Sequence, residues 1–345
     1  MPLIRESAYS APFWLPGGHC QTIYPSFFRK VQVPDLQTYR LNTPDGDFLL
    51  LERAQASTSR SRLVGSLDTT NSRVVILSHG LEGHSRRQYI LGMARTFMDA
   101  GWDAIAWNFR FCSPFAPDGV GEPNFAPRMY HSGETGDLRT VLEHALSLGY
   151  TEILLVGFSM GGNQILKFFG EDGDALPSEV RGGVAVSVPC DLTASCRELS
   201  RGFNKVYVKN FLKTLLLKVK RKHAQTPDLI NIEGIDSIES FDEFDGRYTA
   251  PLHGFASAGD YWAKASSKQF LGGIRRPVLL LNSMNDPFLP AECLPYDAAR
   301  ESEYLFLETP NCGGHVGFTA KDRQPWGDRY WSEWRALEFS LGITG

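Results

Sequence analysis

Ser159 stands in a Gly-x-Ser-x-Gly pattern, within the stretch GFSMGG at residues 157–162. The apolar run EILLV before it predicts a buried strand, and a helical pattern begins at Gly161. Glycines permit the sharp turn from strand to helix that would hold a serine hydroxyl out at the strand end. Held in this way, the hydroxyl could attack a carbonyl carbon as a nucleophile. The alternative is a glycine-rich turn whose serine has no catalytic role.

A serine nucleophile needs two partners, because an alcohol is a poor nucleophile at neutral pH. A base must accept its proton, and an acid must orient that base. With this kind of turn, the chain order is serine, acid, histidine, and each residue comes just after a strand. Asp286 follows the apolar run PVLLLNS, and His315 follows the run EYLFLE. We therefore predict that Asp286 is the acid and His315 the base; the alternative is a capping aspartate and a surface-loop histidine.

Other histidines and acids fit these roles less well. His144 falls on a predicted helix, His253 lies in an inserted segment, and His79 comes too early in the chain order. Asp260 and Asp297 do not directly follow a predicted strand.

Acyl transfer also needs hydrogen-bond donors for the oxyanion that forms at the carbonyl. Two backbone N–H groups usually supply them, one just after the nucleophile and one in an earlier loop after a strand. Met160 follows the serine, and Leu81 lies in the stretch HGLEG, where glycines allow a tight turn. We predict these two N–H groups as the oxyanion hole. The alternative for HGLEG is an ordinary turn at a strand end.

The surrounding chain predicts a sheet that could position these residues. Short apolar runs alternate with helical patterns from residue 74 onward, which is typical of a parallel sheet covered by helices. The runs QTYRLNT and DFLLLERA flank the turn PDGD and predict a hairpin at one edge, giving about eight strands in all. The predicted helices span residues 89–100, 134–148, 161 onward and 326–341.

Two segments interrupt this alternation. Residues 54–73 are rich in Ser, Thr and Arg and predict an exposed loop. Residues 191–270 separate two strands by more than a crossover helix needs, which predicts a helical cap after the sixth strand. We therefore divide the chain into a first part of the core (1–190), the cap (191–270) and a second part of the core (271–345).

Composition limits the function classes. The chain of 345 residues has 35 Lys and Arg against 39 Asp and Glu, a net charge of −4 that does not favour nucleic acid as a partner. Its six cysteines form no CxxC pair and no metal-ligand spacing, so we expect no metal site, no disulfide framework and a reducing compartment. We also expect that the reaction needs no cofactor. The N-terminal residues lack the pattern of a signal peptide, which predicts a cytosolic protein.

Several motifs together resemble the YheT-like, abhydrolase-type branch of the alpha/beta-hydrolase superfamily. They are GGHCQTIYPSFFR, HGLEGHSRRQYI, NFRFCS, RMYHSGETGDL, GFSMGGN, TAPLHGFASAGDYWAKAS, NDPFLP and CGGHVGF, and they cover roughly residues 12–340. The resemblance implies an alpha/beta-hydrolase fold and an esterase- or lipase-like enzyme with Ser159, Asp286 and His315 in its triad. The chain departs from the family at Phe111, where a glycine is usual, and in an insertion at residues 114–120.

We therefore expect a serine hydrolase that cleaves carboxylic esters with a hydrophobic acyl group, acting on a small ester or a lipid. Two rivals stay open: an acyltransferase that passes the acyl group to an alcohol, and a non-catalytic binding protein on the same fold. Phe158, Met160, Phe288 and Phe318 could line an acyl pocket or belong to the core. The oligomeric state is left open.

Residues 203–223 predict an amphipathic cap helix with seven Lys or Arg and no acid. Its expected apolar face comprises Phe203, Tyr207, Phe211, Leu212, Leu215, Leu216 and Val219. One interpretation is a cap helix with its apolar face over the pocket and its lysines in water. The other adds peripheral contact with an anionic membrane.

Overall fold

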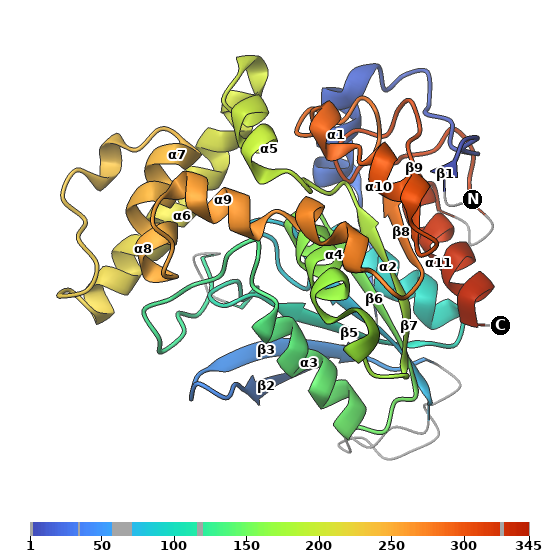
Figure 1. The fold of residues 1–345 in the computed structure, drawn as a ribbon, viewed down its shortest axis with the longest axis horizontal. Coiled ribbons are helices and arrows are strands. Elements are labelled where there is room, and N and C mark those ends of the chain that lie inside the picture. Colours follow the sequence, from blue (N-terminus) through green and yellow to red (C-terminus); the bar gives the residue numbers. More distant parts are fainter. Residues whose placement is uncertain (1–2, 34, 57–70, 116–119, 325–327, 345) are drawn as a thin grey trace.

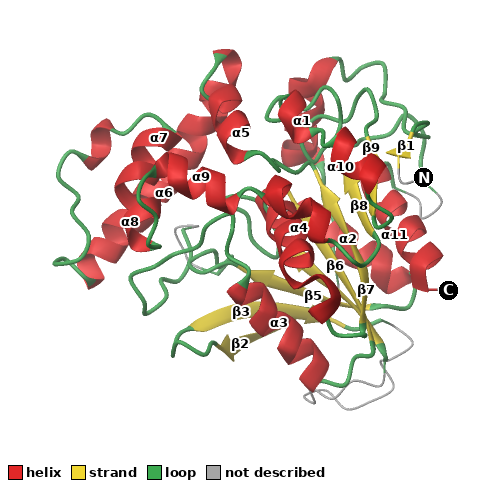
Figure 2. Ribbon diagram, in the orientation of Figure 1, coloured by secondary structure: helices red, strands yellow, loops and turns green. Residues whose placement is uncertain are grey.

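A nine-stranded sheet forms the centre of the molecule (Figures 1 and 2). The computed structural model describes residues 3–33, 35–56, 71–115, 120–324 and 328–344. Most of the predicted loop at 54–73 and part of the insertion at 114–120 lie outside these residues. The strands are β1 (Leu3–Ile4), β2 (Gln37–Asn42), β3 (Phe48–Ala54), β4 (Arg73–Ser78), β5 (Asp103–Asn108), β6 (Glu152–Phe158), β7 (Val180–Val186), β8 (Val278–Leu281) and β9 (Leu305–Glu308).

The strand order is β1-β9-β8-β7-β6-β4-β5-β3-β2, and all neighbours run parallel except β2 with β3 and β3 with β5. The antiparallel pair is the predicted hairpin, with Asn42 opposite Phe48 at its turn. The sheet has one strand more than expected because the two-residue β1 pairs with β9 at the other edge. In the parallel part the carboxyl ends of the strands meet at one edge, where ligands bind in open alpha/beta sheets.

Helices cover both faces of the sheet, and alternate residues of each central strand pack against the helices on opposite faces. On β4, Ile76 packs with the apolar side chains of α3 and α4, whereas Val75 and Leu77 pack with those of α2 and α11. Side chains of a strand point alternately to the two faces, so fully apolar strands fit a sheet covered on both sides. The helices are α1 (Gly17–Phe28), α2 (Gln88–Asp99), α3 (Gly136–Ser147), α4 (Met160–Asp172), α5 (Leu192–Leu199), α6 (Lys205–Gln225), α7 (Phe241–Phe244), α8 (Ala250–Leu252), α9 (Ala258–Ala265), α10 (Tyr296–Glu301) and α11 (Trp331–Thr344).

Helices α5 to α9 come between β7 and β8, the place where the sequence predicts an inserted cap. In Figure 1 this segment, coloured yellow-green to orange, extends to one side of the sheet. We call residues 191–270 the cap segment. It follows the seventh strand rather than the sixth, because β1 adds one strand at the start of the count. The division of the chain into three domain parts remains a prediction.

Helix α6 corresponds to the predicted amphipathic helix, but its lysines do not all point to solvent. Lys205, Lys209 and Lys213 are exposed, as expected. Lys218 and Lys222 are buried, so for these two the expectation was wrong. Each ammonium group has buried hydrogen-bond acceptors, which offset the cost of removing a charge from water.

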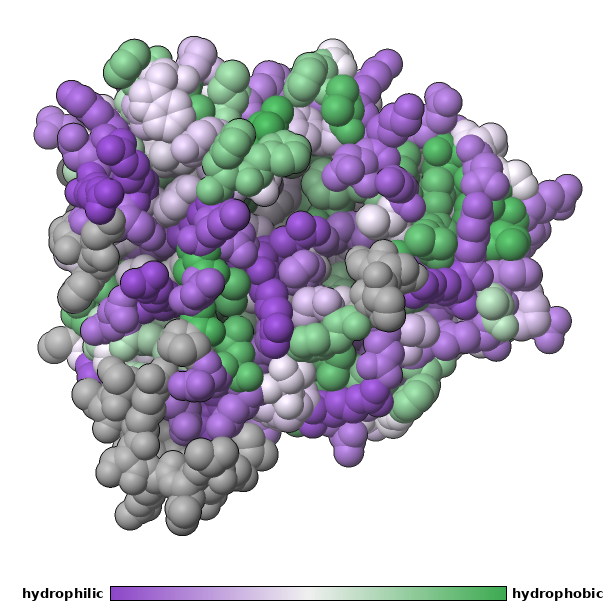
Figure 3. Space-filling model, turned by 180° about the vertical axis from the view of Figure 1, so that it is seen from behind, coloured by the Kyte–Doolittle hydropathy of each residue, from purple (hydrophilic) through white to green (hydrophobic). Residues whose placement is uncertain are grey.

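The exposed surface mixes polar and apolar side chains, as the view from behind shows (Figure 3). Phe203, at the start of the predicted apolar face, is 52% exposed. Among the described residues, no helix combines the length and apolar character needed to span a bilayer. Peripheral contact with a membrane remains a prediction.

Candidate active site

Ser159 lies at the sharp turn between β6 and α4. Its backbone has φ 53° and ψ −118°, a conformation that costs about 1–3 kcal/mol in a residue with a side chain. The turn is possible because its neighbours are glycines: a Cβ on Gly157 would lie 2.4 Å from the Gly161 carbonyl oxygen. A Cβ on Gly161 would lie 2.5 Å from the His79 carbonyl oxygen. The two glycines therefore bring the start of α4 against both β6 and the loop after β4.

The structure brings Ser159, His315 and Asp286 together from three segments of the chain. The His315 Nε2 atom lies 2.9 Å from the Ser159 hydroxyl oxygen, and His315 Nδ1 lies 2.8 Å from Asp286 Oδ2. Asp286 comes after β8 and His315 after β9, as the chain order predicts. The Asp286 side chain is fully buried, and that of His315 is 9% exposed. In this arrangement His315 can accept the serine proton while Asp286 accepts a hydrogen bond from Nδ1–H.

Asp286 is itself held in place. Its Oδ1 atom accepts a hydrogen bond of 2.9 Å from the Phe288 N–H, which leaves Oδ2 for His315. The Phe288 ring packs on the imidazole of His315, with 4.2 Å between ring centroids. These contacts orient the carboxylate and the imidazole toward each other.

Two of the alternative histidines, His79 and His144, have other partners, whereas His253 lines the same cavity as Ser159. The Phe109 N–H donates to His79 Nε2 at 3.1 Å, so His79 Nδ1 carries the proton and donates to the Gly80 carbonyl at 2.7 Å. Burial lowers the pKa of His79 well below its usual value. His144 pairs with the hydroxyl of Tyr39 on the far hairpin. Neither histidine is placed to accept a proton from Ser159.

The two predicted oxyanion donors lie beside the serine. Leu81 and Met160 line the same cavity as Ser159 and His315. A Cβ on Gly80 would lie 3.2 Å from Ser159 Cβ, so the loop after β4 rests directly against the serine. Met160 opens α4, where the first N–H groups of a helix have no acceptor within it. Within the described residues, neither the Leu81 nor the Met160 N–H donates to another group, which leaves both available to a ligand.

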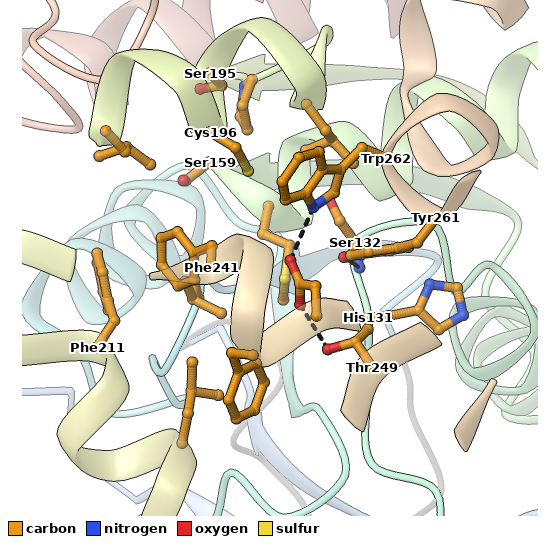
Figure 4. Close-up of a pocket in the computed structure, with 18 of the residues that line it drawn as sticks. His131, Ser132, Ser159, Ser195, Cys196, Phe211, Phe241, Thr249, Tyr261 and Trp262 are labelled. Carbon is orange, nitrogen blue, oxygen red and sulfur yellow. Dashed lines mark hydrogen bonds between the residues drawn. The ribbon is translucent and has the colours of Figure 1, made fainter. Parts of the chain in front are cut away.

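An apolar cavity of about 110 Å³ opens beside Ser159 (Figure 4). Met160 and Phe288 line it, whereas Phe158 and Phe318 are buried in the core. The cap segment supplies much of its wall through Leu192, Leu199, Phe211, Leu215, Phe241, Phe244, Tyr261 and Trp262. The cavity is thus suited to a hydrophobic group attached to the carbonyl that Ser159 would attack.

Asp245 is a carboxylate in the cap-segment wall of this cavity. It accepts hydrogen bonds from the Thr249 hydroxyl at 2.6 Å and the Trp262 indole N–H at 2.8 Å, the dashed lines in Figure 4. Burial raises the pKa of Asp245 to about 6. The first bond lies within the π-helical segment Asp245–Thr249, and the second joins that segment to α9. Among the described residues, no group of His, Cys, Asp or Glu side chains is arranged to hold a metal ion.

Helix α1 contributes site contacts that sequence reasoning missed. The Gln21 Oε1 atom accepts from the Gly313 N–H at 2.8 Å and from the Asn285 side-chain amide at 3.0 Å. The Thr22 hydroxyl oxygen accepts from the His315 N–H at 2.8 Å. Through these bonds α1 holds the acid loop and the histidine loop together. The signal in the sequence that could have indicated these contacts was the polar pair Gln21 and Thr22, which interrupts a largely apolar segment.

Phe111, the departure from the family pattern, has a backbone that favours glycine. Its φ is 64°, in the left-handed region that costs a residue with a side chain about 1–2 kcal/mol. Phe111 is 1% exposed, and the centroid of its ring lies 5.8 and 5.7 Å from the ammonium nitrogens of Lys218 and Lys222. Burial of the ring and these cation–π contacts offset the strain.

The chain matches the family described as the alpha/beta hydrolase fold over residues 73–322. It is 33% identical over 306 residues to the candidate esterase YheT of Escherichia coli (strain K12), covering 87% of this chain and 84% of YheT. It is 28% identical over 319 residues to human phospholipase ABHD3, covering 92% of this chain and 75% of that protein. The esterase Pf2001 of Pyrococcus furiosus shares the fold, with a TM-score of 0.57 at 14% identity, covering 90% of this chain and 94% of that one. The chain therefore belongs to the alpha/beta-hydrolase family, in the branch that contains YheT and the ABHD3 phospholipases.

Proposed function

We propose that this protein hydrolyses carboxylic esters with a hydrophobic acyl group through an acyl-enzyme on Ser159. The observation that carries the proposal is the continuous set of contacts from Ser159 through His315 to Asp286, next to an apolar cavity. The names of the relatives, a candidate esterase and a phospholipase, support the same reaction class.

In the proposed reaction, His315 takes the proton of Ser159 as its oxygen attacks the ester carbonyl. The N–H groups of Leu81 and Met160 stabilise the oxyanion of the tetrahedral intermediate. His315 then gives the proton to the leaving alcohol as the carbonyl–oxygen bond of the ester breaks, which leaves the acyl group on Ser159. Water repeats the cycle and releases the carboxylic acid.

A series of p-nitrophenyl esters from acetate to palmitate tests the proposal. Each methylene that enters the apolar cavity should raise kcat/KM about fourfold, because burying one CH₂ is worth about 0.8 kcal/mol. We expect this rise to stop at the chain length that fills the cavity. A flat series, or turnover that persists without Ser159, would contradict the proposal. Analysis of products with added glycerol separates hydrolysis from acyl transfer, since transfer yields a new ester.

A further inference from the structure

The loop that carries Leu81 contains an unfavourable backbone conformation. Glu82 has φ 53°, in the left-handed region that residues with side chains rarely adopt. Leu81 lines the cavity directly before it, and the Gly83 N–H donates to the Gly80 carbonyl at 2.9 Å, so Leu81 and Glu82 are the two central residues of one tight turn. A strained turn persists only where its surroundings hold it.

The contacts of the Glu82 side chain hold this turn in place. Its carboxylate accepts a hydrogen bond of 2.6 Å from the Lys218 ammonium group, with side-chain exposures of 7% and 3%. The Tyr130 hydroxyl donates to the same carboxylate oxygen, and the Glu82 N–H donates to the Tyr130 oxygen at 3.2 Å. Both the carboxylate and the backbone of Glu82 are therefore anchored in a buried cluster.

Lys218 reaches this cluster from the cap segment. It lies on α6, the helix whose Phe211 and Leu215 line the cavity. Its ammonium group also donates to the Cys112 sulfur at 3.2 Å. Burial lowers the pKa of Lys218, but Cys112 and Glu82 outweigh that effect and raise it overall, so the lysine stays charged. Three other side chains that hold the loop lie outside the cap segment: Tyr130, Tyr89 and Arg87, whose guanidinium donates to the Glu82 carbonyl at 3.1 Å.

We propose that Lys218 is a positioning residue for the oxyanion hole: its ion pair with Glu82 holds the turn that aims the Leu81 N–H at the substrate carbonyl oxygen. This inference rests on the proposed esterase function. If Lys218 has this role, the geometry of the oxyanion hole depends on the position of α6. The same helix then both lines the cavity and holds the loop that carries the Leu81 N–H.

The test compares Lys218→Met with Lys222→Met. Lys222 is a matched control, because it is a buried lysine one turn along α6 that donates to the backbone carbonyls of Asn124 and Ala126 instead.

The measurement is kcat per reactive site. A fluorophosphonate, left to react to completion, counts the sites with a reactive serine. Loss of an oxyanion donor costs about 100-fold or more in kcat. We expect Lys218→Met to approach 100-fold with KM nearly unchanged, whereas Lys222→Met should change kcat less than fivefold.

A double mutant adds a second readout. If Lys218 acts through Glu82, then Lys218→Met combined with Glu82→Gln should lose no more kcat than the worse single variant. The inference is overturned if Lys218→Met behaves like Lys222→Met, if its loss lies in KM, or if the losses of the pair multiply. A wild-type protein that neither hydrolyses esters nor reacts with the fluorophosphonate would instead defeat the proposed function itself.

Discussion

Replacing Ser159 with alanine should lower kcat on p-nitrophenyl esters by about 10⁵-fold or more. The alanine removes the oxygen that lies 2.9 Å from His315 Nε2, and the oxyanion donors alone would leave only a small residual rate. The fold should persist, because the substitution removes one atom from a partly exposed side chain. Steady-state kinetics of the purified variant, with thermal unfolding as a check on the fold, measure this directly.

Ser195→Ala is the matched control for this loss. Ser195 also lines the cavity, but its hydroxyl donates to the Phe288 carbonyl at 2.7 Å instead of to a histidine. Its loss should change kcat less than tenfold. Similar losses in both variants would mean that the cavity, rather than the nucleophile, had been damaged.

Replacing Asp286 with asparagine should lower kcat at neutral pH by about 10⁴-fold, and the structure explains why so small a change would be so damaging. The Phe288 N–H needs an acceptor at the position of Asp286 Oδ1, so the amide oxygen of asparagine should take that place. Its NH₂ group would then face His315 Nδ1 and donate to it. The imidazole would have to carry its proton on Nε2, where it could no longer accept one from Ser159.

Asp297→Asn is the control for this substitution. Asp297 was a competing acid in the sequence, but its side chain is 91% exposed and pairs with Arg300. Its kcat should equal that of the wild type within experimental error. An Asp286→Asn variant with near wild-type kcat would show that Asp286 does not orient the base.

Much of the fold and of the site could be predicted because the signals are local. The apolar runs of β4, β6, β7 and β8 are buried on both faces and are read directly from the sequence. In a parallel sheet the carboxyl ends of strands meet at one edge, so residues just after those strands must come close together. Ser159, Asp286 and His315 each follow a strand in this way, which is why chain order was enough to select them.

The parts that could not be predicted depend on contacts between distant segments. Gln21 accepts a hydrogen bond from the Gly313 N–H, 292 residues further along the chain, and the local sequence marks Gln21 only as polar without indicating this partner. The sequence predicts that the lysines of this helix lie in water, because a lysine is costly to bury alone, and only the tertiary structure supplies Glu82 as the partner of Lys218. The two-residue β1 is too short to have a pattern of its own.

Covalent labelling tests the central claim most directly, because it asks whether Ser159 is a nucleophile without assuming a substrate. The folded protein is treated with a fluorophosphonate, digested and analysed by mass spectrometry. We predict one stoichiometric phosphonyl adduct, on Ser159, that forms neither in Ser159→Ala nor in protein unfolded before treatment. No adduct on the folded protein, or an adduct on another residue, would contradict the assignment of Ser159 as the nucleophile.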